Sequence, residues 1–409
     1  MANQDSEQEL LNKIKKSLEE RGLEFCQDNE SNEFVGKGGF GDVYKVQNKK
    51  NNHLVYAAKI LTKDVSNNKE PIKDFRGKNI VKINNEIDGG DKYYIYMMEY
   101  SRYGNLKKFI KNIDNEKKRR ILKEPFLEQI GDNLVRFFVK QMVTGLKSFY
   151  IGNLVHFDIK PENLVLFQNL ELKFIDFNLL RKIDDEDKYD RRIPGGTQGY
   201  TTPEFYSSYE KLDDDTLRSQ DYFAIGSTIF YLKYNKPMLS YIIHNNEGDA
   251  ETVREIKNDS VVASIEEAMN FIKRQKYQDK DFSDFLCSLL QFKPEYRPTF
   301  EEIVRNKWLN KNSEEIEKIV NIHRFNESNL LLELQKSDFL INNAEHYRKK
   351  YEEKNSLKNS DEKYIMVRKG KFKFGKKIKN KLFFGLFNKD IYKYNENHKK
   401  YLYKIFDYY

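Results

Sequence analysis

The sequence has very few cysteines and no long apolar run. Cys26 and Cys287 are the only cysteines in 409 residues, too few and too far apart for a disulfide framework or a zinc site. This scarcity is typical of a reducing compartment, so we expect a cytoplasmic protein, with the nucleus as the alternative. No run of about 18 apolar residues could span a bilayer, so we expect no transmembrane segment. The first residues lack the layout of a secretory signal, and Ala2 stands where N-myristoylation needs glycine.

Acidic residues are scarce near the C-terminus. Residues 363–409 contain 14 lysines and arginines against three acidic residues, which gives this segment a charge of +11 in a chain of net charge +8. The rest of the chain is therefore slightly acidic, at −3. Hydrophobic residues make up 39% and aromatic residues 14%, enough to fill a sizeable core, so a wholly disordered chain is excluded. The length allows about two to three domains.

The order of sequence patterns predicts a sheet-rich part followed by a helix-rich part. Residues 5–21 place leucine and isoleucine on one helix face, which indicates a short docked helix rather than a partner-binding one. Residues 43–46 and 55–60 have strand-like patterns. Residues 112–131 indicate a solvated insertion, and the apolar stripe over residues 134–149 predicts a long helix. Two such parts suggest two lobes with a cleft between them.

A glycine-rich turn lies directly before the strand predicted at residues 43–46. It contains Gly36-x-Gly38-x-x-Gly41-x-Val43. Glycines let the backbone approach phosphate oxygens and offer N–H groups to them, where a Cβ would obstruct. Alone this is a weak signal, because such turns also occur in ordinary hairpins. A strand rather than a helix follows the turn, which excludes the dinucleotide-binding version.

Several further motifs follow in order along the chain. They are Ala57-Ala58-Lys59, His156-Phe157-Asp158-Ile159-Lys160-Pro161-Glu162-Asn163, Asp176-Phe177-Asn178, Gly196-Thr197-Gln198-Gly199-Tyr200, Glu204, Asp221, and Tyr296-Arg297-Pro298. With the glycine-rich turn, this series resembles the eukaryotic serine/threonine protein kinase family over residues 31–309. The resemblance implies an α+β, bilobal fold, with a small antiparallel sheet lobe and a larger helical lobe. Residues 1–30 would then be an N-terminal helical extension and residues 310–409 a C-terminal helical and basic/aromatic extension.

The resemblance implies a role for each matching residue. Asp158 would be the catalytic base that accepts the substrate hydroxyl proton, and Lys160 would steady the transferring phosphate. Asn163 and Asp176 would hold Mg²⁺, a hard cation that prefers oxygen ligands. Lys59 would reach the ATP phosphates. The implied ATP-binding residues are Gly36, Lys37, Gly38, Gly39, Phe40, Gly41, Val43, Lys59, Glu99 and Ser101.

The resemblance also implies residues outside the chemistry itself. Thr197 and Tyr200 would seat the acceptor residue in the serine/threonine style. Glu204 and Arg297 would form a buried ion pair, and Asp221 would brace the catalytic loop. The backbone from Glu99 to Ser101, after Met98, would bind adenine.

The sequence departs from the family pattern before Asp158. Phe157 replaces the usual arginine, which normally pairs with a phosphate on the activation loop. Between Asp176 and Gly196 there is no serine or threonine, and Tyr189 is the only acceptor. We therefore expect that Ser/Thr phosphorylation does not switch this loop on. The acidic residues 184–187 would either pair with Arg181, Arg191 or Arg192, or form a mobile acidic loop.

Two more departures concern the segment Asp176-Phe177-Asn178 and the partner of Lys59. Asn178 replaces the glycine of Asp-Phe-Gly, and asparagine tolerates the left-handed conformation best among residues with a Cβ, so we expect Asp176 still to bind metal. The helix that should supply a glutamate partner for Lys59 is too short to identify, and Pro71 discourages it. The plausible acidic partners are Asp64, Glu70 and Asp74.

The C-terminal extension contains a capping box at Asn312 and Glu315, which predicts a helix bearing Ile316, Ile319 and Val320. Helical patterns also cover residues 328–353. Basic and aromatic residues then alternate over 367–377. Segment 363–409 could bind an anionic partner, namely a membrane surface, nucleic acid or an acidic protein, or form a strand pair with a solvated basic face docked on the second lobe.

The sequence favours a serine/threonine kinase that uses ATP and Mg²⁺ to phosphorylate protein substrates. The alternative is a pseudokinase scaffold that binds nucleotide or partners without efficient transfer, because the partner of Lys59 is not evident. A nucleic-acid-binding protein with a relic kinase fold is a third, weaker hypothesis. The retention of Lys59, Asp158, Lys160, Asn163 and Asp176 favours the enzyme.

Overall fold

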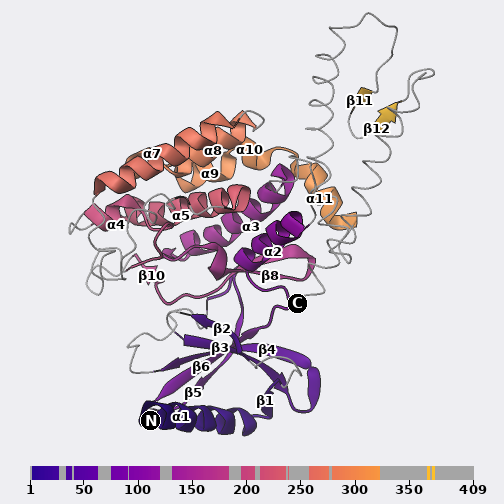
Figure 1. The fold of residues 1–409 in the computed structure, drawn as a ribbon, viewed down its shortest axis with the longest axis vertical. Helices are drawn as coiled ribbons and strands as arrows, with labels where there is room; N and C mark the ends of the chain where they lie inside the picture. The colour runs from indigo at the N-terminus through magenta and orange to yellow at the C-terminus, as the bar shows by residue number, and fades with distance from the viewer. Residues whose placement is uncertain are drawn as a thin grey trace, which may run out of the picture.

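The computed structural model consists of a sheet lobe and a helical lobe (Figure 1). It describes residues 2–26, 34–38, 41–62, 75–90, 92–119, 131–183, 195–207, 212–235, 238, 258–275, 279–322, 366–368 and 371–373. The sheet lobe precedes the helical lobe in the chain, and the two meet where the last sheet strand leads into the first helix of the second lobe. The predicted α+β, bilobal fold is confirmed.

The first lobe is built on a six-stranded antiparallel sheet. Its strands are β1 (Leu23–Phe25), β2 (Phe34–Gly38), β3 (Gly41–Asn48), β4 (Asn51–Thr62), β5 (Ile83–Asp88) and β6 (Tyr93–Glu99). They lie in the order β1-β3-β4-β6-β5, and β2 pairs with the other end of β3. Strand β1 is absent from the sequence prediction, because three residues are too few to show alternation. Its pairing with β3, which puts Leu23 opposite Asn48, makes it a strand.

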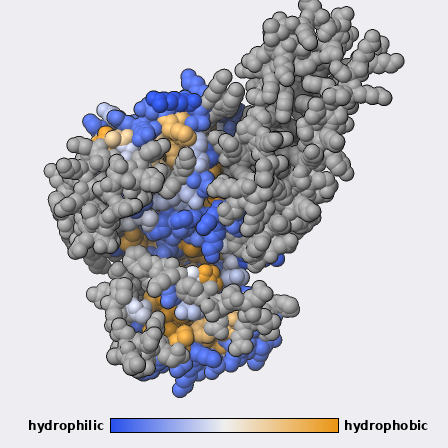
Figure 2. All heavy atoms as spheres, viewed as in Figure 1, coloured by the Kyte–Doolittle hydropathy of each residue, from blue (hydrophilic) through white to orange (hydrophobic). Residues whose placement is uncertain are grey.

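Helix α1 (Ala2–Glu19) packs on this sheet, as expected for residues 5–21. Ile14 and Leu18 are buried in an apolar cluster with Ile95 of β6. The hydroxyl of Ser17 lies 2.7 Å from the hydroxyl of Tyr93. The outer end of the lobe, where α1 lies, is hydrophilic (Figure 2). The apolar face of α1 therefore packs against the sheet of the first lobe.

The second lobe is built around two long helices, α3 and α5. The helices of this lobe are α2 (Leu106–Arg119), α3 (Asp132–Ile151), α4 (Pro203–Ser207), α5 (Asp214–Tyr234), α7 (Asn258–Arg274), α8 (Lys280–Leu289), α9 (Phe300–Arg305), α10 (Lys307–Asn310) and α11 (Ser313–Ile322), with the short turns η2 (Pro161–Asn163), η3 (Gln168–Leu170) and η5 (Pro294–Tyr296). Its small antiparallel pairs are β7 (Leu154–Val155) with β10 (Arg181–Lys182), and β8 (Leu164–Phe167) with β9 (Glu171–Phe174). Helix α5 is buried on nearly all sides, so it forms the centre of the lobe.

Helix α2 extends into a range predicted to be a solvated insertion. Residues 112–119 of the predicted insertion 112–131 are regular helix, and residues 120–130 lie outside the described part of the chain. The helix is capped by Asn105, whose Oδ1 accepts a hydrogen bond from the backbone N–H of Lys108 at 2.9 Å. No proline or glycine follows within the helix, so a helix begun in this way has no local reason to stop.

The packed lobe continues beyond the end of the kinase resemblance. Trp308 is fully buried and stacks on Phe285, and the guanidinium of Arg136 lies 4.8 Å from the Trp308 ring. Helix α11 begins directly after Asn312, as predicted, and buries Ile316 against this core. The predicted helical patterns over 328–353 lie outside the described residues.

Within the basic segment 363–409 the structure describes one strand pair, β11 (Met366–Arg368) and β12 (Lys371–Lys373), with Val367 opposite Phe372. This pair lies apart from the helices of the second lobe in Figure 1. Binding of an anionic partner by the segment stays a prediction. No helix among the described residues is both long and apolar enough to cross a membrane.

Candidate active site

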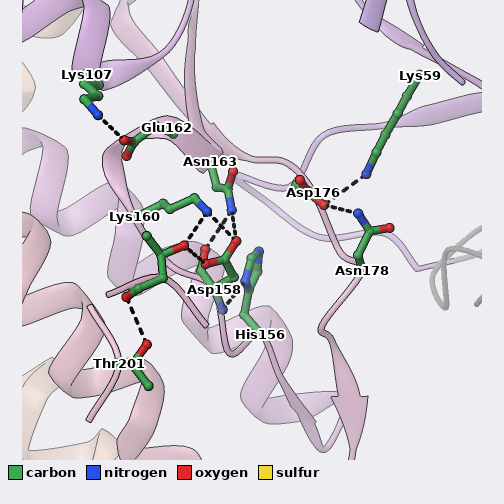
Figure 3. A network of polar contacts seen from close by, with 11 residues as sticks. Lys59, Lys107, His156, Asp158, Lys160, Glu162, Asn163, Asp176, Asn178 and Thr201 are labelled. Atoms are coloured by element: carbon green, nitrogen blue, oxygen red, sulfur yellow. Dashed lines mark hydrogen bonds and ion pairs between the residues drawn. The ribbon is translucent and has the colours of Figure 1, made fainter. Parts of the chain in front are cut away.

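The loop between β7 and β8 collects polar side chains around Asp158 (Figure 3). Lys160 Nζ donates to Asp158 Oδ2 at 2.7 Å, and the Thr197 hydroxyl donates to Asp158 Oδ1 at 2.6 Å. Asn163 Nδ2 donates to the backbone carbonyl and to Oδ2 of Asp158, both at 2.8 Å. Lys160 also donates to the Thr197 hydroxyl at 2.6 Å. The structure therefore brings together three residues predicted for catalysis, and Thr197 with them.

The backbone of this loop is held by Asp221 of helix α5. Its two carboxylate oxygens accept the backbone N–H groups of His156 at 2.8 Å and Phe157 at 3.0 Å. Phe157 has a φ of 62°, which is uncommon for a bulky residue. Complete burial raises the pKa of Asp221 to about 7, although the two N–H donors favour its charged form. Asp221 braces the loop that carries Asp158, as predicted.

His156 supports the loop from inside the core. Its Nδ1 accepts the backbone N–H of Asp158 at 3.2 Å, and its ring lies 5.7 Å from that of Phe177. Burial lowers the pKa of His156, although the negative charges of Asp158 and Asp176 oppose this effect. A neutral imidazole that accepts at Nδ1 fits this contact. No role was predicted for His156.

Asp176, the second candidate metal ligand, is paired with Lys59. Lys59 Nζ donates to Asp176 Oδ1 at 3.0 Å, and Asn178 Nδ2 donates to the same oxygen at 2.7 Å (Figure 3). Burial alone would raise the pKa of Asp176, but the charge and hydrogen bond of Lys59 bring it below its ordinary value. Asp176 is therefore ionised at neutral pH.

The residues present fit a hard divalent cation. Asn163 commits its Nδ2 to Asp158, which leaves its amide oxygen for a ligand, and Asp176 supplies a carboxylate. No group of three or more His, Cys, Asp or Glu side chains in the described part of the chain could hold a metal by itself. Mg²⁺ is usually held by one or two side-chain ligands together with substrate phosphates and water, so a two-ligand site matches it.

The backbone of the Asp176–Asn178 segment corrects one expectation. We expected Asn178 to take the left-handed conformation of the glycine that it replaces. The positive φ of 62° belongs to Asp176 instead, and Asn178 has no positive φ. The asparagine is tolerated because its side chain finds a hydrogen-bond partner in Asp176, not because its backbone is left-handed.

The glycine-rich turn joins β2 and β3, with Gly36 opposite Val43, Lys37 opposite Asp42 and Gly38 opposite Gly41. A Cβ on Gly41 would lie 2.2 Å from the carbonyl oxygen of Ile60, so close packing against β4 requires this glycine. A Cβ on Gly36 would meet nothing within 4 Å. The predicted contacts of Gly39 and Phe40 lie outside the described residues.

The segment that joins the lobes contains Glu99 and Ser101. The Glu99 carboxylate accepts Lys173 Nζ at 2.8 and 2.9 Å, and the backbone N–H of Lys82 at 3.0 Å. Ser101 Oγ contacts the carbonyl of Leu166 and accepts the backbone N–H of Tyr103 at 3.0 Å. Both side chains are therefore engaged with the protein, and their backbone groups remain the candidates for adenine.

A protein-family model for the protein kinase domain matches residues 29–309. The chain belongs to the protein kinase family. The curated relatives indicate the eukaryotic serine/threonine type. Rat serine/threonine-protein kinase MRCK beta is 26% identical over 219 residues, which are 51% of this chain and 12% of that protein. Mitogen-activated protein kinase pmk-3 of Caenorhabditis elegans is 27% identical over 200 residues, 44% of this chain and 41% of the relative. Human citron Rho-interacting kinase is 23% identical over 280 residues, which are 65% of this chain and 12% of that protein.

The residue that this kinase has in place of the usual arginine is part of an apolar cluster. Phe157 is 9% exposed and packs with Ile183 and with Leu217 of α5. Ile183 follows the Asp176–Asn178 segment in the chain. The backbone N–H of Ile183 donates to the carbonyl of Asn153 at 2.9 Å. Acidic residues 184–187, predicted to pair with arginines, lie outside the described residues, as does Tyr189. The candidate partners of Lys59, Asp64, Glu70 and Asp74, also lie outside them, together with Pro71.

The segment from Thr197 to Glu204, which is predicted to seat the acceptor residue, is anchored to the helical core. The Thr201 hydroxyl donates to the carbonyl of Thr197 at 2.9 Å, and burial raises the pKa of Tyr200. Arg297 Nη2 lies 2.6 Å from Glu204 Oε1, which is the predicted buried ion pair. The contact between Asn178 and Asp176 was not predicted, although the replacement of glycine by Asn178 was a signal for it.

Proposed function

We propose that this kinase transfers the γ-phosphate of ATP to serine or threonine hydroxyls of protein substrates, with Mg²⁺ as cofactor. Family membership supports a protein kinase in general. The observation that carries the specific proposal is the arrangement around Asp158, whose two carboxylate oxygens contact Thr197 at 2.6 Å and Lys160 at 2.7 Å. A base that is oriented from both sides matches a hydroxyl acceptor that must be deprotonated in one position.

In the proposed reaction Asp158 accepts the proton of the acceptor hydroxyl. The hydroxyl oxygen bonds to the γ-phosphorus, the bond from that phosphorus to the bridging oxygen breaks, and ADP leaves. Lys160 places a positive charge beside Asp158, where it can also stabilise the charge on the phosphoryl oxygens. Thr197 ties the substrate-seating segment to Asp158, so the acceptor and the base are positioned by the same contact.

Asn163 and Asp176 would hold the metal ion, which when bound neutralises charge on the β- and γ-phosphates. The ionised state of Asp176 and the uncommitted amide oxygen of Asn163 support this role. Lys59 and the turn from Gly36 to Val43 would bind the phosphates, and the backbone from Glu99 to Ser101 would bind adenine.

We also propose that apolar packing, rather than a phosphate, holds the start of the activation segment. The support is the contact of Phe157 with Ile183 and Leu217, together with the lack of serine and threonine between Asp176 and Gly196.

The proposed function is tested with γ-labelled ATP, Mg²⁺ and a generic basic protein substrate. Wild type should label the substrate, and D158N and D176A should not. D215N is the matched control, because the Asp215 side chain is 98% exposed, and it should label as wild type does. Label in wild type equal to that in D158N, from protein that melts cooperatively and binds ATP, would contradict the proposal and support a pseudokinase.

A further inference from the structure

Asn178 is held in place beside the candidate metal ligand. The preceding Phe177 is buried, with its ring 5.7 Å from that of His156. The carbonyl of Asn178 accepts Arg181 Nη1 at 3.3 Å, and Asn178 itself is only 5% exposed. Its side chain therefore starts from a fixed backbone and has little room to rotate.

Two side-chain hydrogen bonds to the Asp176 carboxylate end on the same oxygen. Asn178 Nδ2 and Lys59 Nζ donate to Oδ1, at 2.7 and 3.0 Å. The backbone N–H of Asn178 also stabilises the charged carboxylate. The Asp176 side chain is 20% exposed, so it is open toward the site. Two donors on Oδ1 fix the plane of the carboxylate and leave Oδ2 for another ligand.

Lys59 alone would fix this plane poorly. Its ammonium sits at the end of a four-carbon stem, and in the proposed function it also serves the ATP phosphates. The short side chain of Asn178 has no such second task. It therefore remains a donor to Asp176 Oδ1 when the charge of Lys59 is shared with nucleotide.

We propose that Asn178 is a positioning residue, which orients the Asp176 carboxylate so that Oδ2 is presented to the divalent cation. This inference rests on the proposed function, because it requires that Asp176 binds the metal that accompanies ATP. Hydrogen-bond partners that orient a metal ligand typically contribute about 10- to 100-fold in metal affinity.

The test is Mn²⁺ binding, followed by electron paramagnetic resonance in the presence of a non-hydrolysable ATP analogue. N178A removes the donor, and N178L removes it while keeping a similar side-chain volume. Both should weaken Mn²⁺ binding by about 10-fold, whereas affinity for the analogue in EDTA should stay at the wild-type value. The Mg²⁺ concentration that gives half-maximal transfer should rise by the same factor.

R181A is the matched control. It removes a contact to the carbonyl of Asn178 without touching the amide, so it should bind Mn²⁺ as wild type does. Wild-type Mn²⁺ affinity in folded N178A or N178L would overturn the inference and leave the proposed function standing. Equal weakening in R181A would also overturn it, because the effect would then come from the loop. An absence of analogue-dependent Mn²⁺ binding in wild type would instead remove the proposed function, and the inference with it.

Discussion

The loop that carries Asp158 and the segment that begins at Asp176 lie beside each other, but different parts of the molecule hold them. The loop carrying Asp158 is bonded to Asp221, a fully buried residue at the centre of the helical lobe. Asp176 is held by Lys59 from the sheet lobe and by Asn178, two residues away. The geometry of Asp158, the proposed base, is therefore a property of the helical core, whereas that of Asp176, the proposed metal ligand, depends partly on a contact between lobes. Changes that disturb the position of Asp158 should therefore also lower the stability of the protein. Changes that disturb the position of Asp176 should cost little stability.

The largest effect on stability is expected from breaking the ion pair of Glu204 and Arg297 in the helical lobe. The Arg297 side chain is 0% exposed and that of Glu204 11%, so R297A leaves a carboxylate buried without its partner. We expect the free energy of unfolding to fall by about 3–5 kcal/mol, measured by urea denaturation.

The matched control for R297A is the exposed pair of Lys293 and Glu295, whose side chains are 57% and 59% exposed. K293A should change the free energy of unfolding by less than about 1 kcal/mol. Equal losses of stability in R297A and K293A would show that the Glu204–Arg297 pair does not anchor the segment around Glu204 to the helical core.

D221A should come next, because it leaves the backbone N–H groups of His156 and Phe157 buried without acceptors. We expect a loss of about 3 kcal/mol in the free energy of unfolding. Displacement of Asp158 should lower transfer by about 100-fold in the protein that remains folded. Urea denaturation and labelled-ATP transfer, with exposed D215A as the control, measure the two losses. Wild-type stability in D221A would contradict the bracing role.

Replacing Phe157 tests how the two regions are joined. F157R removes an apolar side chain from contact with Ile183 and Leu217, and it should lower the free energy of unfolding by about 2–3 kcal/mol. Transfer should fall with it, and incubation with other Ser/Thr kinases should not restore it, because residues 177–195 contain no serine or threonine. F157L should keep most of the wild-type activity. Transfer by F157R at or above the wild-type level would refute apolar anchoring.

K59M should have the smallest effect on stability and still stop the reaction. Lys59 lowers the pKa of Asp176, so the pair stabilises the folded state above the ordinary carboxyl pKa and loses that contribution as pH falls. K59M should therefore be about 1 kcal/mol less stable than wild type at neutral pH, and this difference should shrink as the pH falls below about 4. Transfer should be lost at neutral pH. A stability difference unchanged by pH would show that the ion pair is not its cause.

The sequence was sufficient for the parts of the site that motif order defines. It predicted one site for Asp158, Lys160 and Asn163, which lie in contact in the structure, and it predicted the Glu204–Arg297 pair and the brace at Asp221. Those roles follow from residue identity within a shared register. Pairing of β1 with β3 could not be predicted in this way, because the strand is too short to show a pattern and depends on distant residues.

Two substitutions were recognised in the sequence, but their consequences were not. The environment of Phe157 depends on residues of α5 and of the segment after Asp176, which are brought together only by the fold. Asn178 was interpreted through backbone propensity, yet its side-chain hydrogen bond explains why it is accepted. Local propensity is a weak guide where a tertiary contact is available.

The most direct test of the central claim is the identity of the phosphorylated residue. Peptide mixtures whose only acceptor is serine, threonine or tyrosine would be incubated with ATP and Mg²⁺, and phosphate would be located by mass spectrometry in wild type and D158N. The account predicts phosphoserine or phosphothreonine from wild type, no phosphotyrosine, and none of these from D158N. Phosphotyrosine, or phosphorylation of wild-type extent by D158N, would contradict it.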